Sequence, residues 1–561
     1  MKKLRASMVC INSKYIHSSL APWCLLAGIK KYGDKNIIGT VVEGTINEDI
    51  SQIVQRVSDT APDVVGLSCY IWNIKRVHKL VAMLKQLNPK LIVILGGPEV
   101  SYNARETLEN YTNVDFIISG EGELPMALTL NSILNSGDYD IDGLCYRENS
   151  EIIVSEPFVS KEEPPTPYCQ EYFDSLKGRI AYLETSRGCP YSCAFCLSGR
   201  CGNARFFDVQ RAKDEIIMLA NSGTKTIKLV DRTFNANKKR ATEIVQFIAE
   251  SYGKAIPKGV CIHFEIAGDI LDERLLDSFK RLPVGAVQLE IGMQSFNEKT
   301  LEYINRKTNT EVLKKNIKTL ISFGNMHIHI DLIAGLPFED ISSIKNSFNI
   351  GFELKPHMLQ FGFLKLLYGA DMRENTEKYP CEYSQEPPYE IISNQWLTSQ
   401  ELKNLHYFED ALDRLYNSGR FKRTLNYILS TVNLKAFDVF YDFGMYSKNN
   451  VRKNIPLSDY IEKVYGYFSE VLNINRDILR DMLVCDRLAI DSSGIIPKAL
   501  QRDNYKIKAA RKLLNSNAST MPKENIRRTI EVLVSQNKII YTDYDEKNPV
   551  TGEYIINFID N

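Results

Sequence analysis

The chain has 561 residues, and its 69 Lys and Arg residues are balanced by 69 Asp and Glu residues. At roughly 150 residues per domain, this length predicts three or four domains. The balanced charge argues against a nucleic-acid coat or a polybasic membrane tail. No run approaches the ~18 apolar residues needed to span a bilayer, and the N-terminus leads into no signal-type apolar stretch. A cytoplasmic multidomain protein is therefore expected, with no membrane partner.

The first 150 residues alternate short apolar runs with amphipathic helical patterns. Short apolar strands separated by helices are typical of a parallel sheet covered on both faces. Residues 1–150 are therefore predicted to form a doubly wound, Rossmann-like α/β domain. The predicted strands are 6–11, 37–42, 64–68, 91–96, 116–119 and 144–146, and the predicted helices are 20–32, 50–59, 74–87 and 123–134.

Small and polar residues follow several of these strands. His17 lies in the segment after the first strand, Ser68 ends the third, Gly96 and Gly97 end the fourth, and Glu121 follows the fifth. A doubly wound sheet binds ligands beyond the carboxyl ends of its strands, and glycine lets the backbone approach a bulky ligand. These residues are candidate ligand contacts. The alternative is that the Gly-Gly-Pro sequence only turns the chain into the next helix.

Residues 151–175 are polar and rich in proline, as in Glu-Glu-Pro-Pro-Thr-Pro at 162–167. Proline removes backbone donors and stiffens an extended chain, so a linker is predicted here. A second strand–helix series follows over 176–394, and its six repeats predict a partial (βα)6 barrel. Its predicted strands are 180–185, 226–230, 261–266, 287–291, 327–332 and 359–365.

Long helical patterns over 399–416, 456–472 and 475–483 predict that residues 395–561 form a mostly helical domain. This domain is expected to close with a hairpin of strands 538–542 and 554–558. A basic stretch at 506–512 is interpreted as the solvated face of a helix. The sequence has no glycine-rich or aromatic RNA-binding signature, so nucleic acid is not expected as a partner.

Three of the twelve cysteines form a dense group just after the first strand of the second series. Cys189, Cys193 and Cys196 are spaced C-x3-C-x2-C, and three thiolates on one short loop can hold three corners of an iron–sulfur cubane. A structural zinc site would need four ligands, and no second cysteine pair occurs nearby. Cys201 is interpreted as a loop residue, with a redox or substrate-contacting role left open.

In this spacing and placement the chain resembles the radical S-adenosylmethionine (SAM) superfamily. The resemblance implies a 4Fe–4S cluster bound by Cys189, Cys193 and Cys196 as both metal ligands and catalytic residues. It also implies that SAM chelates the open iron and is cleaved to a 5′-deoxyadenosyl radical. An electron donor such as flavodoxin or ferredoxin would supply the electron. The cofactor carries the difficult chemistry while the barrel excludes water.

Other strand ends resemble the SAM-binding segments of this superfamily less closely. Asp231 stands where many members carry a Gly-Gly-Glu segment, and it is the nearest polar substitute. Glu290 and Gln294 resemble SAM-contacting residues of the fourth strand, and Gly335 resembles the glycine that packs on the adenine. The alternative for each is an ordinary polar layer of the barrel.

A doubly wound domain before such a barrel resembles the cobalamin-binding class of radical SAM proteins. Ser68, Gly96, Gly97, Glu121 and His17 lie in the segments that carry this resemblance. The Asp-x-His-x-x-Gly motif, whose His ligates cobalt in many cobalamin domains, is absent from the sequence. We therefore expect cobalamin to bind without a protein His. Ligation by His17, or loss of cobalamin binding, are the alternatives.

With both cofactors, the resemblance implies methylation of an unactivated carbon of a small-molecule or peptide substrate. The 5′-deoxyadenosyl radical would activate the carbon, and methylcobalamin would supply the methyl group. One alternative is radical chemistry without methylation, such as cyclisation or rearrangement. Another is a redox- or cobalamin-sensing protein. Residues 395–561 resemble an extension of unclear role in one branch of the class.

Overall fold

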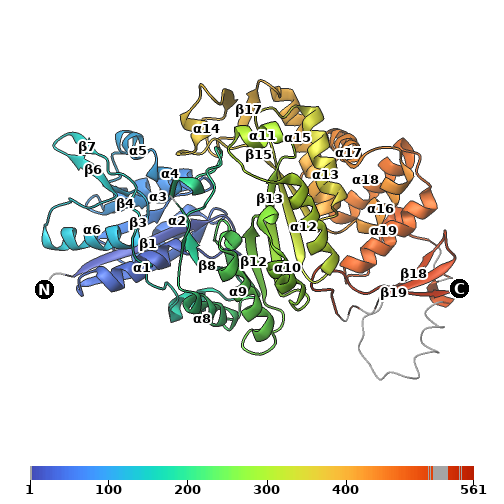
Figure 1. The fold of residues 1–561 in the computed structure, drawn as a ribbon, viewed down its shortest axis with the longest axis horizontal. Coiled ribbons are helices and arrows are strands. Elements are labelled where there is room, and N and C mark those ends of the chain that lie inside the picture. The colour runs from blue at the N-terminus through green and yellow to red at the C-terminus, as the bar shows by residue number, and fades with distance from the viewer. Residues whose placement is uncertain are drawn as a thin grey trace. The chain divides into compact units, whose positions relative to one another are not determined.

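The structure, a computed structural model, describes residues 3–201, 203–502, 505, 507–509, 529–542, 544 and 546–560. The chain forms two compact units (Figure 1). The first unit contains Met1–Val287, Glu302–Thr308 and Leu364–Ile392. The second contains Gln288–Leu301, Asn309–Phe363 and Ser393–Asn561. Within the described part of the chain, no helix has both the length and the apolar content of a membrane span.

The first unit opens with a seven-stranded sheet of order β2-β1-β3-β4-β5-β6-β7. Strands β1 to β5 are parallel, and β6 pairs antiparallel with both β5 and β7. The strand order reverses between β1 and β3, so the topological switch point lies at the carboxyl ends of these two strands. The strands are β1 Leu4–Asn12, β2 Ile37–Thr45, β3 Val64–Ser68, β4 Ile92–Gly96, β5 Phe116–Ile118, β6 Leu144–Glu148 and β7 Glu151–Ile153.

Helices cover both faces of this sheet, which confirms the predicted doubly wound fold (Figure 1). Helix α2 shows how the sequence achieves this, because its buried residues Ile50, Ile53, Val54 and Val57 recur at helical spacing and face one core. Met126 of α6 lies in the core of the opposite face. The helices are α1 Ala21–Tyr32, α2 Ile50–Asp59, α3 Ile74–Leu87, α4 Pro98–Ser101, α5 Ala104–Asn110 and α6 Glu123–Asn135.

The segment 151–175, predicted as a linker, is partly structured. Its first residues form β7 and extend the sheet, and Phe158 forms a parallel bridge with Gly120. Residues 159–169, which contain the proline-rich sequence, form neither helix nor strand. Helix α7 (Gln170–Ser175) then leads into the second strand–helix series.

Strands and helices alternate through this second series, as predicted for a partial (βα)6 barrel. In the first unit β8, β11 and β12 are parallel neighbours, and in the second unit β13, β14 and β15 are parallel neighbours. Buried and half-buried residues alternate along β13, so polar side chains such as Glu290 share its less buried face. The strands are β8 Ala181–Leu183, β11 Thr226–Leu229, β12 Cys261–Ile266, β13 Val287–Gln294, β14 His327–Ala334 and β15 Met358–Phe363. The helices are α8 Val209–Ala220, α9 Lys238–Ser251, α10 Glu273–Lys280, α11 Glu298–Tyr303, α12 Thr310–Phe323 and α13 Ile341–Glu353.

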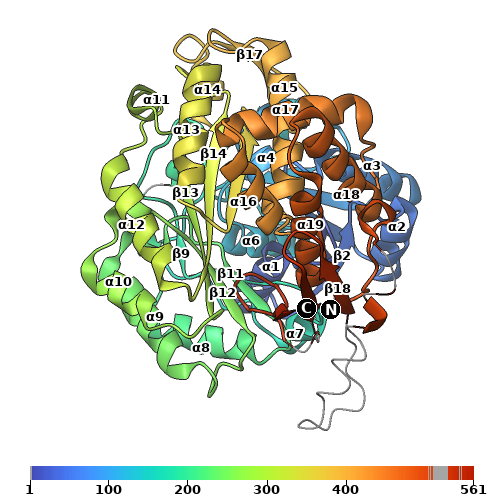
Figure 2. The ribbon, with the colours of Figure 1, turned by 90° about the vertical axis from the view of Figure 1, so that its right-hand side faces the viewer.

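The rest of the second unit is mainly helical (Figure 2). Its core is rich in aromatic side chains. Phe348 of α13 packs edge to face with Phe408 of α15 and with Phe437 and Phe440 of α17, at ring-centroid distances of 4.9, 5.9 and 6.0 Å. Such edge-to-face pairs add to the free energy gained from burial alone. The helices of this part are α15 Ser399–Leu412, α16 Lys422–Thr431, α17 Ala436–Asn450, α18 Leu457–Gly466 and α19 Arg476–Ile490. The first unit also contains α14 Asp371–Glu374 and β16 Cys381–Tyr383, and β17 Ile391–Asn394 has residues in both units.

The chain ends in a three-stranded antiparallel sheet of β18 (Thr529–Leu533), β19 (Lys538–Thr542) and β20 (Asn557–Asp560). The two-stranded hairpin predicted from the sequence was therefore incomplete, and its last strand begins later than predicted. Strand β18 was missed because it is short and carries a charged residue, Glu531, whose buried carboxylate pairs with Arg480 of α19 at 2.8 Å. Residues 506 and 510–512 of the predicted basic stretch lie outside the described residues.

Candidate functional site

The three clustered cysteines lie on one loop of the first unit. The loop, residues 188–204, is closed at its base by a short antiparallel ribbon of β9 (Ser186–Arg187) and β10 (Arg205–Phe206). Cys189, Cys193 and Cys196 are all free thiols. Cys193 is buried and the other two are half-buried, so the loop offers three sulfur ligands without a competing disulfide.

Backbone hydrogen bonds hold the middle of this cysteine loop. The N–H of Ala194 donates to the carbonyl of Ile304 at 2.9 Å, and the carbonyl of Ala194 accepts from the N–H of Met372 at 3.0 Å. The N–H of Ser198 also points at the sulfur of Cys196, at 3.4 Å. The loop is therefore shaped by two distant segments of the first unit, which the sequence pattern did not indicate.

Arg306 is a residue of this site that the sequence analysis missed. Its Nη1 lies 3.8 Å from the sulfur of Cys193, although the two residues are 113 positions apart. Burial raises the pKa of the Cys193 thiol, while the positive charge of Arg306 lowers it. Arg306 thus favours the thiolate, which is the form that binds iron.

Asp231 lies beside the base of the loop, and its carboxylate is already occupied by protein donors. It accepts the N–H of Thr185 at 2.7 Å, the hydroxyl of Thr185 at 2.6 Å and the N–H of Ser186 at 3.1 Å. Burial raises the pKa of Asp231, and these hydrogen bonds oppose that effect. The side chain therefore holds the chain that leads into the cysteine loop.

In the second unit, Glu290 lies close to two residues of the neighbouring strand. His329 Nε2 lies 2.9 Å from an Asp331 oxygen, and its Nδ1 lies 3.9 Å from a Glu290 oxygen. One imidazole and two carboxylates are a donor set that a divalent cation can accept. They are equally suited to a cationic or hydrogen-bonding group of a ligand.

Gln294 and Gly335 both have left-handed backbone conformations. Gln294 has φ of 68° next to a bulge in the pairing of β13 with β14. This conformation is uncommon for a residue other than glycine, and such strain often occurs at functional sites. Gly335 has φ of 93°, and its carbonyl accepts a hydrogen bond from Asn394 at 3.0 Å.

Glu339 follows Gly335 closely and is another residue that the sequence analysis missed. Its buried carboxylate accepts the hydroxyls of Ser295 at 2.6 Å and Ser343 at 2.9 Å. Burial raises the pKa of Glu339 to about 7, although both hydroxyls oppose this rise. The hydrogen bonds join the end of β13 to the start of α13.

The predicted ligand contacts Ser68, Gly96 and Gly97 lie together at the carboxyl edge of the N-terminal sheet. Ser68 and Gly96 are paired residues of β3 and β4. Gly97 has φ of 104°, and a Cβ there would come within 2.6 Å of the Cys69 carbonyl oxygen. The turn after β4 therefore requires glycine, and the Gly-Gly-Pro sequence does turn the chain, into helix α4.

Apolar side chains are exposed at the same edge. Tyr15, after β1, is 69% exposed, and Trp72, after β3, is 46% exposed. The ring of Trp72 stacks on Tyr70 with a centroid distance of 4.4 Å and an interplanar angle of 5°. Exposed rings at a topological switch point offer an apolar surface to a large flat ligand.

His17 lies after β1, where its ring nitrogen Nδ1 is 2.7 Å from the hydroxyl of Tyr182. Burial lowers the pKa of His17, and the neighbouring Lys14 lowers it further. Hydrogen bonding to Tyr182 of β8 leaves Nε2 as the nitrogen that a metal would have to use. The carbonyl of His17 accepts a hydrogen bond from Arg179 at 2.7 Å, which holds this segment against the start of the second strand–helix series.

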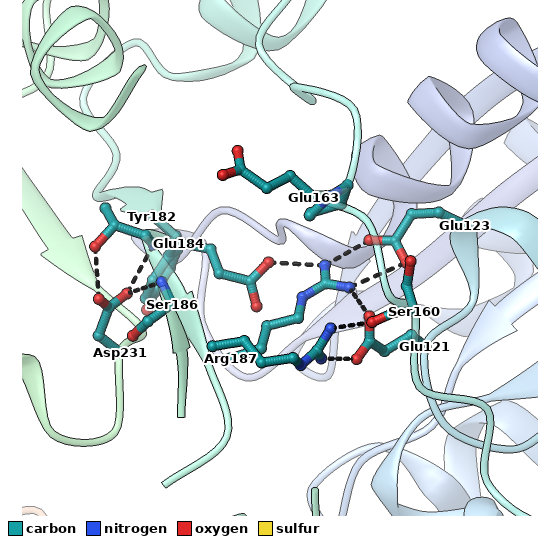
Figure 3. Close-up of polar contacts among 12 residues, drawn as sticks. Glu121, Glu123, Ser160, Glu163, Tyr182, Glu184, Ser186, Arg187 and Asp231 are labelled. Carbon is teal, nitrogen blue, oxygen red and sulfur yellow. Dashed lines mark hydrogen bonds and ion pairs between the residues drawn. The ribbon is translucent and has the colours of Figure 1, made fainter. Parts of the chain in front are cut away.

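Glu121 takes part in an ion-pair network rather than facing solvent. Arg187 reaches between Glu184 on one side and Glu121 and Glu123 on the other (Figure 3). Both Glu121 oxygens are engaged, one by Arg187 and the other by Arg205. The resemblance implies that Glu121 contacts the cofactor; in the structure its charge is matched by two arginines at the base of the cysteine loop.

Three family models match the chain. Residues 6–129 match the B12 binding domain, residues 183–349 match the radical SAM superfamily, and residues 377–546 match a protein family of unknown function, DUF4080. The first two matches coincide with the doubly wound domain and with the region that holds the cysteine loop. The chain therefore contains both a B12-binding domain and a radical SAM domain.

Curated relatives include two methyltransferases. The cobalamin-dependent radical SAM methyltransferase TokK of Streptomyces tokunonensis is 30% identical over 52% of this chain and 45% of its own length. The 2-(S-pantetheinyl)-carbapenam-3-carboxylate methyltransferase of Streptantibioticus cattleyicolor is 28% identical over 54% of this chain and 47% of its own length. The chain thus spans about half the length of these relatives.

Among solved structures, the cobalamin-dependent SAM radical enzyme OxsB, with aqua-cobalamin and SAM bound, matches with a TM-score of 0.60. The match covers 93% of this chain and 82% of OxsB at 14% sequence identity. This likeness shows a shared fold over nearly the whole chain.

Proposed function

We propose that this protein is a cobalamin-dependent radical SAM methyltransferase that acts on an unactivated carbon. The observation that carries the proposal is that three free cysteines lie on one loop whose base is ion-paired to the B12-binding domain within one compact unit. Methyl transfer to a carbon radical requires that the donor be held next to that carbon. The chain combines the two domains that such chemistry needs.

The cysteine loop fits a 4Fe–4S cluster. Cys189, Cys193 and Cys196 would each ligate one iron through a thiolate. Arg306 favours the thiolate of Cys193, and the Ser198 N–H supplies a hydrogen bond of the kind that tunes cluster sulfur ligands. When bound, the cluster supplies the electron that cleaves SAM and releases a 5′-deoxyadenosyl radical.

The SAM-contacting residues are assigned from resemblance and local geometry. In the second unit we assign Glu290, Gln294 and Gly335 to SAM, and the left-handed φ of Gln294, which is uncommon for a residue other than glycine, supports its assignment. In the first unit, Asp231 acts through Thr185 and Ser186, which it holds by three hydrogen bonds. Asp231 is therefore assigned as a positioning residue.

The carboxyl edge of the N-terminal sheet fits a corrinoid. Ser68, Gly96 and Gly97 would lie under the ring with little side-chain bulk, and the exposed rings of Tyr15 and Trp72 would contact its apolar faces. We expect no His on cobalt because the sequence lacks the Asp-x-His-x-x-Gly motif, whose His ligates cobalt in many cobalamin domains. When bound, cobalamin supplies the carrier for the methyl group.

The proposal includes partners and a location. The substrate would be a small molecule or a peptide, and an electron donor such as flavodoxin or ferredoxin would reduce the cluster. Eleven cysteines of the described part of the chain are free thiols, which is consistent with work in the reducing cytoplasm. Neither nucleic acid nor a membrane is expected as a partner.

The test uses SAM without a substrate, because each candidate function converts SAM into a different set of products. The protein is reconstituted anaerobically with iron, sulfide and hydroxocobalamin, reduced, and given SAM. A methyltransferase forms both 5′-deoxyadenosine and S-adenosylhomocysteine, since the second appears only when SAM gives up its methyl group. Formation of 5′-deoxyadenosine alone would indicate non-methylating radical chemistry, and formation of neither would indicate a sensor.

A further inference from the structure

The base of the cysteine loop has an unusual charge arrangement. On the ribbon that closes the loop, Arg187 of β9 pairs directly with Arg205 of β10. Their side chains are only 13% and 30% exposed. Two like charges facing each other across a ribbon destabilise it unless opposite charges compensate.

Carboxylates of the B12-binding domain supply this compensation. Glu121 bridges the two arginines, with one oxygen 2.8 Å from Nη1 of Arg187 and the other in contact with Arg205. Glu123 lies 2.5 Å from Nη2 of Arg187. Glu184, on the same chain segment as Arg187, completes the set at 2.8 Å (Figure 3).

The position of Glu121 is itself fixed by the backbone. It follows β5 at the carboxyl edge of the sheet, and its N–H donates to the carbonyl of Phe158 at 2.9 Å. Gly120 before it has φ of 89°, and a Cβ there would collide with the backbone of Phe158. Glu123 begins helix α6. Both carboxylates are therefore presented from a rigid edge of the domain.

We propose that Arg187, Arg205 and Glu121 form a clamp that holds the base of the cysteine loop to the B12-binding domain. The clamp engages the carboxyl edge of the domain's sheet, where the corrinoid is proposed to bind and which we call the corrinoid edge. The clamp is a positioning device that makes the spacing between cluster and corrinoid well defined. Partly buried, charge-assisted hydrogen bonds are strong, and the planar guanidinium can bridge several carboxylates at once. Because small misplacements of reacting groups are costly, such a clamp would serve methyl transfer. This inference rests on the proposed function.

A second ion pair offers a matched control. Arg179 donates to Glu43 at 2.6 Å, with side chains 7% and 16% exposed. This pair also joins the N-terminal sheet to the start of the second strand–helix series. It involves no residue of the cysteine loop or of its base. Removing the Arg179–Glu43 pair shows how the loss of a buried ion pair affects the first unit when the clamp on the cysteine loop is left in place.

The experiment compares wild type with R187Q, E121Q and E43Q as full-length protein. Each is reconstituted with iron, sulfide and hydroxocobalamin and poised so that the cluster is reduced and cobalt is Co(II). Pulsed electron paramagnetic resonance then measures the dipolar coupling between the two spins. We expect a narrow distribution of cluster–cobalt distances in wild type and E43Q. In R187Q and E121Q the distribution should be at least twofold wider, while their iron content stays the same as in wild type. The distance distribution of R187K should be as broad as that of R187Q, because one ammonium group cannot replace the guanidinium fork.

Hydrogen exchange of residues 188–204 in the protein without cofactors gives a second measurement. We expect exchange at least tenfold faster in R187Q and E121Q than in wild type, and no change in E43Q. If R187Q does not fold, R205Q replaces it. If R187Q and E121Q have the same distance widths and exchange rates as wild type, the clamp is overturned while the proposed function stays intact. Failure of wild type to bind the cluster or the corrinoid would instead overturn the proposed function, and the exchange data would still decide the clamp.

Discussion

Single side chains near the cysteine loop each have several protein partners. Asp231 accepts three hydrogen bonds, and Arg187 faces three carboxylates. A buried polar side chain that is satisfied on all sides has one orientation and rigidifies its surroundings. Substitutions at this scale should therefore change specific, measurable properties rather than only stability.

His17 provides the first prediction at this scale. Because His17 does not lie in an Asp-x-His-x-x-Gly motif, which the sequence lacks, we expect His17 not to ligate cobalt. The Co(II) form of wild-type protein should show no nitrogen splitting in its electron paramagnetic resonance spectrum, and H17A should give the same spectrum. Nitrogen splitting in wild type that disappears in H17A would contradict this.

Glu339 gives a pH-dependent prediction. Its pKa is raised from 4.5 to about 7 in the folded state. The folded protein therefore holds this proton more tightly, and the stability that results is complete below pH 4.5 and is lost as pH rises through 7. E339Q has no carboxylate to titrate, so it should not lose stability in this way. In urea unfolding, the free energy of unfolding of E339Q minus that of wild type should therefore rise by about 2–3 kcal/mol between pH 4.5 and 8. A pH-independent difference between the two proteins would refute the raised pKa.

At the scale of elements, strand ends and helix junctions determine where the candidate residues lie. The turn after β4 depends on Gly97, and the contact of α19 with β18 depends on Arg480. In both places a local sequence feature is required by a contact with a distant segment. The cost of substitution should follow from that contact.

The turn after β4 should not tolerate a side chain. G97A adds a Cβ within 2.6 Å of the Cys69 carbonyl oxygen at φ of 104°, and we expect a loss of about 2–4 kcal/mol in unfolding free energy and weaker hydroxocobalamin binding. G223A is the control, because Gly223 has φ of 85° but nothing within 4 Å of an added Cβ. It should lose about 1 kcal/mol and keep its corrinoid affinity. Equal losses in both variants would show that the steric contact at Gly97 is unimportant.

The junction of α19 with β18 should depend on its buried charge. Arg480 is fully buried and pairs with Asp481 and Glu531. R480M leaves the Glu531 carboxylate buried without its partner, so we expect a loss of about 3–5 kcal/mol in chemical unfolding. R502M removes an exposed pair with Asp477 at 3.7 Å and an exposed hydrogen bond to the Gln501 carbonyl, and it should cost less than about 1 kcal/mol. A small loss in R480M would mean that Glu531 is protonated or rehydrated in the variant.

At the scale of the whole molecule, the B12-binding domain and the cysteine loop share the first compact unit. They nevertheless use different structural elements, since the proposed corrinoid site lies at the strand ends of the N-terminal sheet and the predicted sulfur ligands lie on residues 188–204. Loss of one cofactor should therefore leave the site of the other intact.

The triple variant C189A/C193A/C196A tests this independence. We expect it to lose the roughly four irons and four sulfides of a reconstituted cluster, while its affinity for hydroxocobalamin stays within about threefold of wild type. C201A should keep the full iron content. Iron analysis and absorbance titration measure both quantities. Retained iron in the triple variant would remove the cluster assignment, and lost corrinoid binding would show that the two sites are not independent.

The sequence by itself determined the architecture and the chemistry of the cysteine loop. Strand and helix periodicities are local properties, so the doubly wound sheet and the strand–helix repeats of the barrel follow from short windows of the chain. The C-x3-C-x2-C spacing is also local, because all three ligands lie on one loop. The short strand β18 escaped prediction because its charged Glu531 is compensated by Arg480, which lies 51 positions away.

Only the tertiary structure decided which side chains support that loop. Arg306 lies 113 positions from Cys193, and Arg187 and Arg205 lie 66 and 84 positions from Glu121. Such contacts depend on how β5, the β9–β10 ribbon and the segment 302–308 pack together. No local pattern encodes this, because the charge of an isolated Glu or Arg does not identify its partner. The residues that surround the predicted cluster ligands are thus set by long-range packing, whereas the predicted ligands themselves follow from their spacing.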